Sequence, residues 1–164
     1  MDREAMSNEE NYAFDAAGYL HVPGVLSRDE VAALNGALDE VGEAEGMLGW
    51  AASERELFRN LLVHPQLVWY LNQMIGHGFR LDQAPRLLGS RDGEIGTNLV
   101  GGDEPRNPSR AYFLQNGRRS SQGVKAIWML EDVDEGAGGL VVVQASHKSN
   151  VATPQDLATG VDEM

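Results

Sequence analysis

Residues 136–150 read GAGGLVVVQASHKSN, a glycine-rich turn followed by a run of β-branched side chains. A short apolar run bounded by glycine and polar residues is typical of a buried strand, so Leu140–Gln144 is predicted to be one. Turn residues interrupt the chain every 8–12 residues or so from Gly76 onward, as in a β sandwich or barrel. The predicted strands of this part are Phe79–Gln83, Arg86–Gly89, Ile95–Val100, Ala111–Gln115, Val124–Glu131 and Leu140–Gln144.

The first 76 residues carry helical signals instead. Ser27 and Glu30 have the spacing of a capping box, and an apolar stripe that begins at Val31 follows them, which predicts a helix over about 28–44. A second capping-box pattern at Ser53 and a proline at Pro65 predict two further helices, the last one ending at Gly76. A helical turn is expected over 12–18 and a short strand over 19–22.

Composition excludes several classes of function. The chain of 164 residues has 25 acidic and 13 basic side chains, a formal charge of −12, which argues against nucleic-acid partners and anionic membranes. It has no cysteine, so disulfides, thiolate metal sites and a cysteine nucleophile are excluded. The polar N-terminus and the absence of a long apolar run predict a cytoplasmic protein. We expect one domain over 12–150, with a helical layer over 12–76 and a β region over 77–150, between a disordered tail at 1–11 and a second tail at 151–164.

Three stretches resemble the phytanoyl-CoA dioxygenase family, within the N-terminal two-thirds of that family's pattern. They are FDAAGYL at 14–20 with PGVLS at 23–27, AIWMLEDV at 126–133, and GGLVVV at 138–143 continued by SHK at 146–148. The resemblance implies an α+β fold in which N-terminal helices pack on a double-stranded β-helix, a jelly-roll or cupin-like barrel. It also implies a non-haem Fe(II) enzyme that hydroxylates a small organic substrate while decarboxylating 2-oxoglutarate.

The metal ligands of such an enzyme are two histidines and one carboxylate, the first two spaced as His-x-Asp or His-x-Glu. None of the four histidines is followed at that spacing by an acidic residue. By the resemblance, Val100 stands where relatives have the first histidine, which leaves Asp103 as the candidate metal ligand. The family's second histidine and its 2-oxoglutarate-binding arginine lie downstream of SHK, and the sequence has neither residue type after His147. We therefore expect that this chain alone does not bind Fe(II) and 2-oxoglutarate.

Other residues have two open interpretations. Trp128 matches a tryptophan of the family's co-substrate pocket, so it is the candidate cofactor-binding residue; plain core packing is the alternative. Lys125, Arg118 and Arg119 could meet an anionic substrate or be exposed loop cations. Each histidine is more simply structural than a ligand, and His147 matches a residue that is not a metal ligand in the family.

The strand count has a consequence for assembly. A double-stranded β-helix closes with about eight strands, and the sequence predicts fewer, so the barrel is expected to be incomplete. Its open edge would leave unpaired backbone groups that favour self-association. Two functions follow as alternatives: a truncated or degenerate oxygenase, or a non-catalytic binding or interaction module on the same scaffold.

Overall fold

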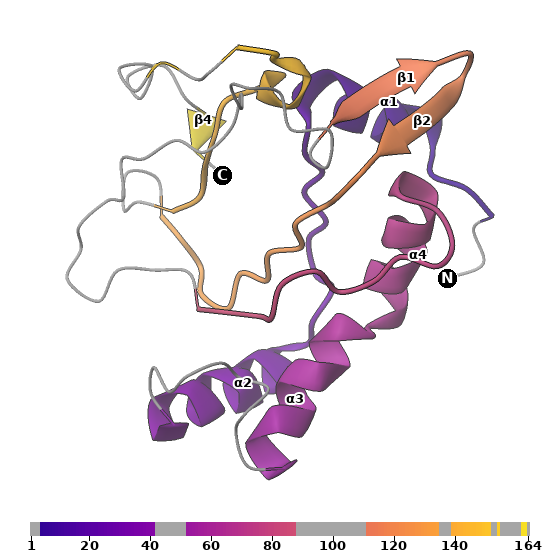
Figure 1. Ribbon diagram of the computed structural model, residues 1–164. Coiled ribbons are helices and arrows are strands. Elements are labelled where there is room, and N and C mark those ends of the chain that lie inside the picture. Colours follow the sequence, from indigo (N-terminus) through magenta and orange to yellow (C-terminus); the bar gives the residue numbers. More distant parts are fainter. Residues whose placement is uncertain are drawn as a thin grey trace. The chain divides into compact units, whose positions relative to one another are not determined.

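A computed structural model describes residues 4–41, 52–87, 111–134, 139–151, 154 and 162–163 (Figure 1). The α+β class is confirmed, with helices first and strands after them. The elements are α1 (Asn8–Ala17), α2 (Arg28–Val41), α3 (Ala52–Leu62), α4 (Pro65–Met74), β1 (Tyr112–Gln115), β2 (Arg118–Ser121), β3 (Val141–Val142), the 3-10 helix η3 (Ser146–Lys148) and β4 (Asp162–Glu163). They fall into two units, one drawn from 22–89 with 126–131 and the other from 2–21, 90–125 and 132–164.

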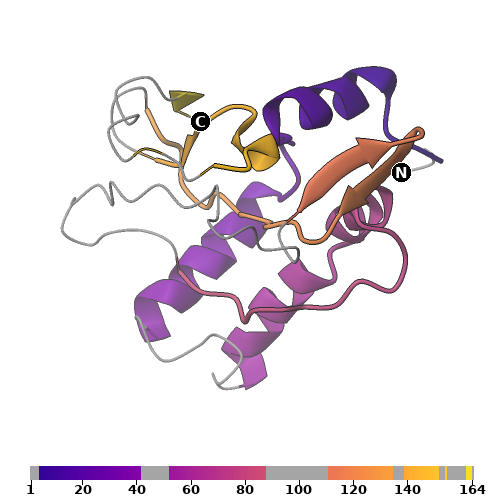
Figure 2. The ribbon, with the colours of Figure 1, turned by 45° about the horizontal axis from the view of Figure 1, so that its top comes forward.

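In the first unit, α2 and α3 pack against each other around a small apolar core (Figure 2). The core consists of Leu34, Ala37, Phe58 and Leu61. The predicted capping box of α2 is confirmed, because the backbone N–H of Ser27 donates to the Glu30 carboxylate at 2.8 Å and the Glu30 N–H donates back to the Ser27 hydroxyl at 3.3 Å.

The next two helices agree only in part with the prediction. Pro65 is the first residue of α4, as predicted, and the Nδ1 atom of His64 caps it by accepting the N–H of Gln66 at 3.3 Å. α3 begins at Ala52, so Ser53 lies inside the helix and is not its cap. Residues 42–44, where the helix now seen as α2 was expected to continue, lie outside the described residues.

The predicted strand Val124–Glu131 does not form. In the same unit, Trp128 and Leu130 pack against the α2–α3 core, and the Leu130 carbonyl accepts the Asn35 side-chain amide at 2.9 Å. A helix side chain therefore binds this extended segment where a neighbouring strand was expected. Its apolar residues signalled burial correctly, but burial against helices needs no strand partner.

The second unit is built on α1 and the β1–β2 hairpin. α1 begins at Asn8 behind a second capping box, in which Ser7 and Glu10 exchange hydrogen bonds of 2.8 and 3.1 Å. Residues 8–11 are thus helical, which corrects the expected boundary of the disordered tail. α1 ends at Ala17 and is capped by Gly18, the predicted stop, and residues 19–22 form no strand.

The hairpin agrees with the prediction in its first strand and corrects it in the second. β1 lies within the predicted Ala111–Gln115, while β2, which carries Arg118 and Arg119, was expected to be loop. Asn116 and Gly117 join the strands with φ values of 53° and 70°, as a type I′ turn requires. The antiparallel register pairs Tyr112 with Ser121 and Gln115 with Arg118.

The other predicted strands are mostly not seen. β3 covers only Val141–Val142 and pairs with β4, inside the expected tail 151–164. Residues 79–87 form no strand, and 88–110, which include the predicted Ile95–Val100, lie outside the described residues. The described strands make two separate two-stranded sheets, so the double-stranded β-helix stays a prediction. No helix of the described part has the length and apolarity that a membrane span requires.

Candidate functional site

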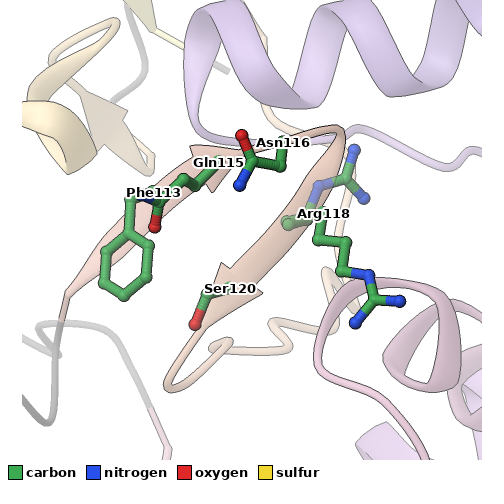
Figure 3. Close-up of a pocket in the computed structure, with 6 residues that line it drawn as sticks. Phe113, Gln115, Asn116, Arg118 and Ser120 are labelled. Atoms are coloured by element: carbon green, nitrogen blue, oxygen red, sulfur yellow. The ribbon is translucent and has the colours of Figure 1, made fainter.

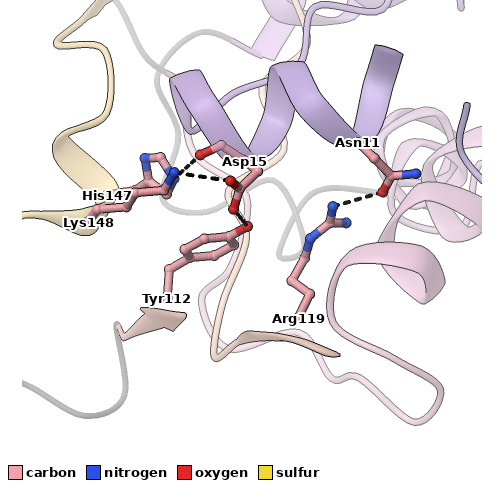
Figure 4. Close-up of polar contacts among 6 residues, drawn as sticks. All are labelled: Asn11, Asp15, Tyr112, Arg119, His147 and Lys148. Carbon is pink, nitrogen blue, oxygen red and sulfur yellow. Dashed lines mark hydrogen bonds and ion pairs between the residues drawn. The ribbon is translucent and has the colours of Figure 1, made fainter. Parts of the chain in front are cut away.

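Polar side chains from three segments that are distant in sequence meet along α1 (Figure 4). We call them the Asp15 cluster. Its members are Asn11, Asp15, Tyr112, Arg119, His147 and Lys148. All six belong to the second unit.

The Asp15 carboxylate is the acceptor at the centre of this cluster. The Tyr112 hydroxyl donates to its Oδ1 atom at 2.6 Å, and the Lys148 ammonium donates to its Oδ2 atom at 3.2 Å. The hydrogen bond from Tyr112, and then Lys148, lower the pKa of the Asp15 carboxyl below its ordinary value of 3.8. Burial and the same bond raise the pKa of Tyr112 above 10.0. Asp15 is therefore an anion that is already solvated by the protein, not a proton donor.

His147 binds the backbone at the end of the same helix. Its Nε2 atom lies 3.1 Å from the Asp15 carbonyl oxygen, which only accepts, so Nε2 carries the proton. The other ring nitrogen, Nδ1, is buried and has no hydrogen-bond partner among the described residues. Burial, the largest effect, lowers the pKa of His147 below 6.5, and the Lys148 charge adds to it. The imidazole is thus held neutral.

Gly18 explains why the imidazole fits so closely. A Cβ at residue 18 would lie 2.7 Å from the His147 Cγ atom, well inside van der Waals contact. Gly18 also has φ +90°, a left-handed conformation that favours glycine. The Ala145 N–H completes this junction by donating to the Ala17 carbonyl at 2.9 Å. The junction joins α1 to the segment that contains η3.

Arg119 occupies the other side of the cluster. One of its guanidinium nitrogens donates to the Asn11 side-chain oxygen at 2.8 Å, and the guanidinium carbon lies 5.0 Å from the centre of the Phe14 ring. Its Nε atom is buried and has no hydrogen-bond partner in the part of the chain that the structure describes. Within the described residues no carboxylate pairs with Arg119. Its charge is stabilised by the cation–π contact with Phe14 and by the hydrogen bond to the Asn11 amide oxygen.

The face of the β1–β2 hairpin opposite to the one that carries Tyr112 contains a shallow hollow (Figure 3). The hollow has a volume of about 400 Å³ and is open to solvent. Its lining residues are Phe113, Gln115, Asn116, Arg118, Arg119 and Ser120. Among the described residues, the lining thus contains two arginines and no acidic residue, in a chain whose acidic residues far outnumber its basic ones.

Trp128 lies in the first unit, beside His64. The two rings meet edge to face, with their centres 5.5 Å apart, and Trp128 packs against the α2–α3 core. A separate apolar groove of about 270 Å³ runs between α2 and α3, with Leu26 and Leu57 among its lining residues. Trp128 is not among the residues that line it. The packing is that of a core residue, and a role in binding a co-substrate stays a prediction.

The residues described do not fit an iron ion. Among them, no three histidine or acidic side chains converge on a point. The Nδ1 atom of His64 caps α4, and both nitrogens of His147 are enclosed by the junction with α1. Asp103, the candidate ligand, lies outside the described residues. These side chains therefore support no chemical step at an iron ion.

Comparisons with known proteins leave the family open. No family model matches the chain, and no curated protein or solved structure matches it.

Sequence reasoning missed the two arrangements that dominate the second unit. The signal for the hairpin was present, because Asn-Gly between two short segments is a strong marker of a type I′ turn. The contact of Asp15 with His147 had no local signal, because the two residues are 132 positions apart.

Proposed function

We propose that the chain is a phytanoyl-CoA dioxygenase-like protein on a double-stranded β-helix scaffold. By resemblance, this places it among the Fe(II)- and 2-oxoglutarate-dependent hydroxylases of small organic substrates. One observation supports the proposal. Two of the three stretches that carry the resemblance, FDAAGYL and SHK, bind each other through Asp15, Gly18 and His147. Their presence in one sequence thus has a physical reason.

A second function, a non-catalytic binding module, rests on a different observation. The Nδ1 atom of His64 accepts the Gln66 N–H. The Nδ1 lone pair of His147 is buried beside Gly18, so neither of these nitrogens is accessible to a metal. An oxygenase of this type needs two such donors with one carboxylate. If the two other histidines, His21 and His77, do not supply these donors, the scaffold would still bind a small organic ligand without oxidising it.

An anaerobic titration separates the two functions. Fe(II) and 2-oxoglutarate are added to the whole chain without oxygen, and calorimetry and visible absorbance are recorded together. A hydroxylase is expected to give a binding heat and a metal-to-ligand charge-transfer band. Asp103→Ala should then abolish the band, and Asp132→Ala, a change at an exposed aspartate, should leave it intact.

The absence of both heat and band would reject the hydroxylase and leave the binding module. A band that survives Asp103→Ala would show that Asp103 is not a ligand. An experimental structure of the whole chain that includes residues 88–110 tests the scaffold itself. Strands there that fail to extend either described sheet would contradict a double-stranded β-helix.

A further inference from the structure

The exposed face of the β1–β2 hairpin brings a cation, a hydroxyl group and an aromatic ring together. Alternation along the strands and the register place Phe113, Gln115, Arg118 and Ser120 on this one face. The other face carries Tyr112 and Arg119, which contact α1. The two faces of the hairpin therefore have separate roles, and the structural one is already accounted for.

Arg118 supplies an unpaired positive charge on this face. Its side chain is exposed, and no ion pair or hydrogen bond of its guanidinium occurs within the described ranges. Lys148 and Arg80, by contrast, each have a carboxylate within 4 Å. A planar guanidinium matches a carboxylate with two parallel N–H···O bonds, a geometry that a lysine cannot offer.

Ser120 adds a neutral donor beside the charge. Its hydroxyl oxygen accepts a hydrogen bond from the Gln122 amide at 3.2 Å, which leaves its own hydrogen free to donate. Arg118 and Ser120 thus both present N–H or O–H groups to the hollow. No described lining residue presents a carboxylate, so an acceptor-only anion meets no like charge from these side chains.

Phe113 supplies a flat apolar surface next to these donors. Phe113 is 42% exposed, although burying a phenylalanine side chain normally stabilises the folded state. It stands opposite Ser120 in the register and diagonal to Arg118. The Cα atoms of diagonal neighbours on one sheet face are about 7–8 Å apart, so one small ligand can reach both side chains.

We propose that this face binds a small aromatic carboxylate, with the carboxylate on Arg118 and Ser120 and the ring against Phe113. The site lies within the hairpin and depends neither on iron nor on the proposed family. Because the hollow is open and has one accessible arginine, binding is weak, with a dissociation constant on the order of 1 mM. Such binding is measured residue by residue in solution.

The test is a titration of the ¹⁵N-labelled whole chain followed by NMR, with benzoate as the probe. Benzoate is expected to shift the Arg118 Nε–Hε and Ser120 amide signals saturably. Arg118→Gln should weaken binding by about tenfold or more, the loss expected for a charge-assisted hydrogen bond. Phe113→Leu, which keeps an apolar side chain without a ring, should weaken it several-fold.

Matched controls separate the two halves of the ligand. Lys125→Gln removes the same charge from an exposed residue outside the hollow, and it should leave binding unchanged. Benzamide keeps the ring without the charge, and inorganic phosphate keeps a charge without the ring; both should bind much more weakly. The proposal is overturned by non-saturating shifts, by Arg118→Gln binding like the wild type, or by phosphate binding as tightly as benzoate.

Discussion

Replacing Gly18 with alanine tests the junction between α1 and the segment 145–148. Gly18 has φ +90°, and an alanine in a left-handed conformation costs about 1–2 kcal/mol. The new Cβ would also overlap the His147 ring, so the imidazole must move and lose its bond to the Asp15 carbonyl. A lost hydrogen bond costs a further 0.5–1.5 kcal/mol or so. The expected total is about 1.5–3.5 kcal/mol.

Gly117→Ala is the matched control within the same unit. Gly117 also has a positive φ, +70°, but a Cβ there meets nothing within 4 Å. It should therefore show the backbone cost alone, about 1–2 kcal/mol. Both variants lose the same glycine freedom in the unfolded chain, so that contribution cancels when they are compared. The difference between them measures the collision with His147.

Urea unfolding followed by circular dichroism gives these values where the m values of the variants agree. A double-mutant cycle of Gly18→Ala with His147→Ala should bring the cost of Gly18→Ala down to that of Gly117→Ala. Hydrogen exchange of the Ala145 N–H, which binds the Ala17 carbonyl, reports on the junction alone. The reasoning is refuted if Gly18→Ala costs no more than Gly117→Ala, or if the cycle shows no coupling.

Four further outcomes are expected in urea unfolding experiments. Gly36→Ala, inside α2 with nothing within 4 Å of the new Cβ, should raise the free energy of unfolding by about 1 kcal/mol. A loss of stability would contradict the open space around Gly36. Ser27→Ala should cost about 1 kcal/mol by removing the cap of α2, and an unchanged midpoint would contradict the cap. Trp128→Ala should cost about 2–3 kcal/mol if its role is core packing, whereas a negligible cost would favour a ligand-binding role. Folding lowers the pKa values of both His147 and Asp15, so their contributions to the free energy of unfolding are complete above about pH 6.5 and pH 3.8, respectively, and are lost as the pH falls through each folded pKa. Asp15→Asn should remove only the loss of stability at the lower pH. A urea midpoint that does not change with pH would contradict both contributions.

The helices were predictable because their signals are local. The start of α2 needs only Ser27, Glu30 and an apolar stripe, all within a few turns of one another. The same logic found Pro65 at the start of α4. It failed at Ser53, which is the second residue of α3 rather than the residue before it, because the spacing of a capping box does not fix the first helical residue.

The strands were less predictable because pairing and burial are different properties. The apolar run around Trp128 signals burial, and helices of the first unit supply it. The segment Arg118–Ser121 is polar and pairs nonetheless, because the Asn116–Gly117 turn returns the chain alongside β1. A turn signal was thus a better guide to this sheet than hydrophobicity.

The Asp15 cluster limits where any chemistry of this chain can occur. Asp15 is held as an anion by Tyr112 and Lys148, and His147 is held neutral against Gly18, so each group already has a structural partner. Moving either of them to a substrate or a metal would break the bonds that join α1 to the later segment. Ligand binding is therefore expected to use other residues, such as Arg118 in the hairpin hollow. An iron site, which needs two histidines and a carboxylate, would have to draw its histidines from elsewhere than His147.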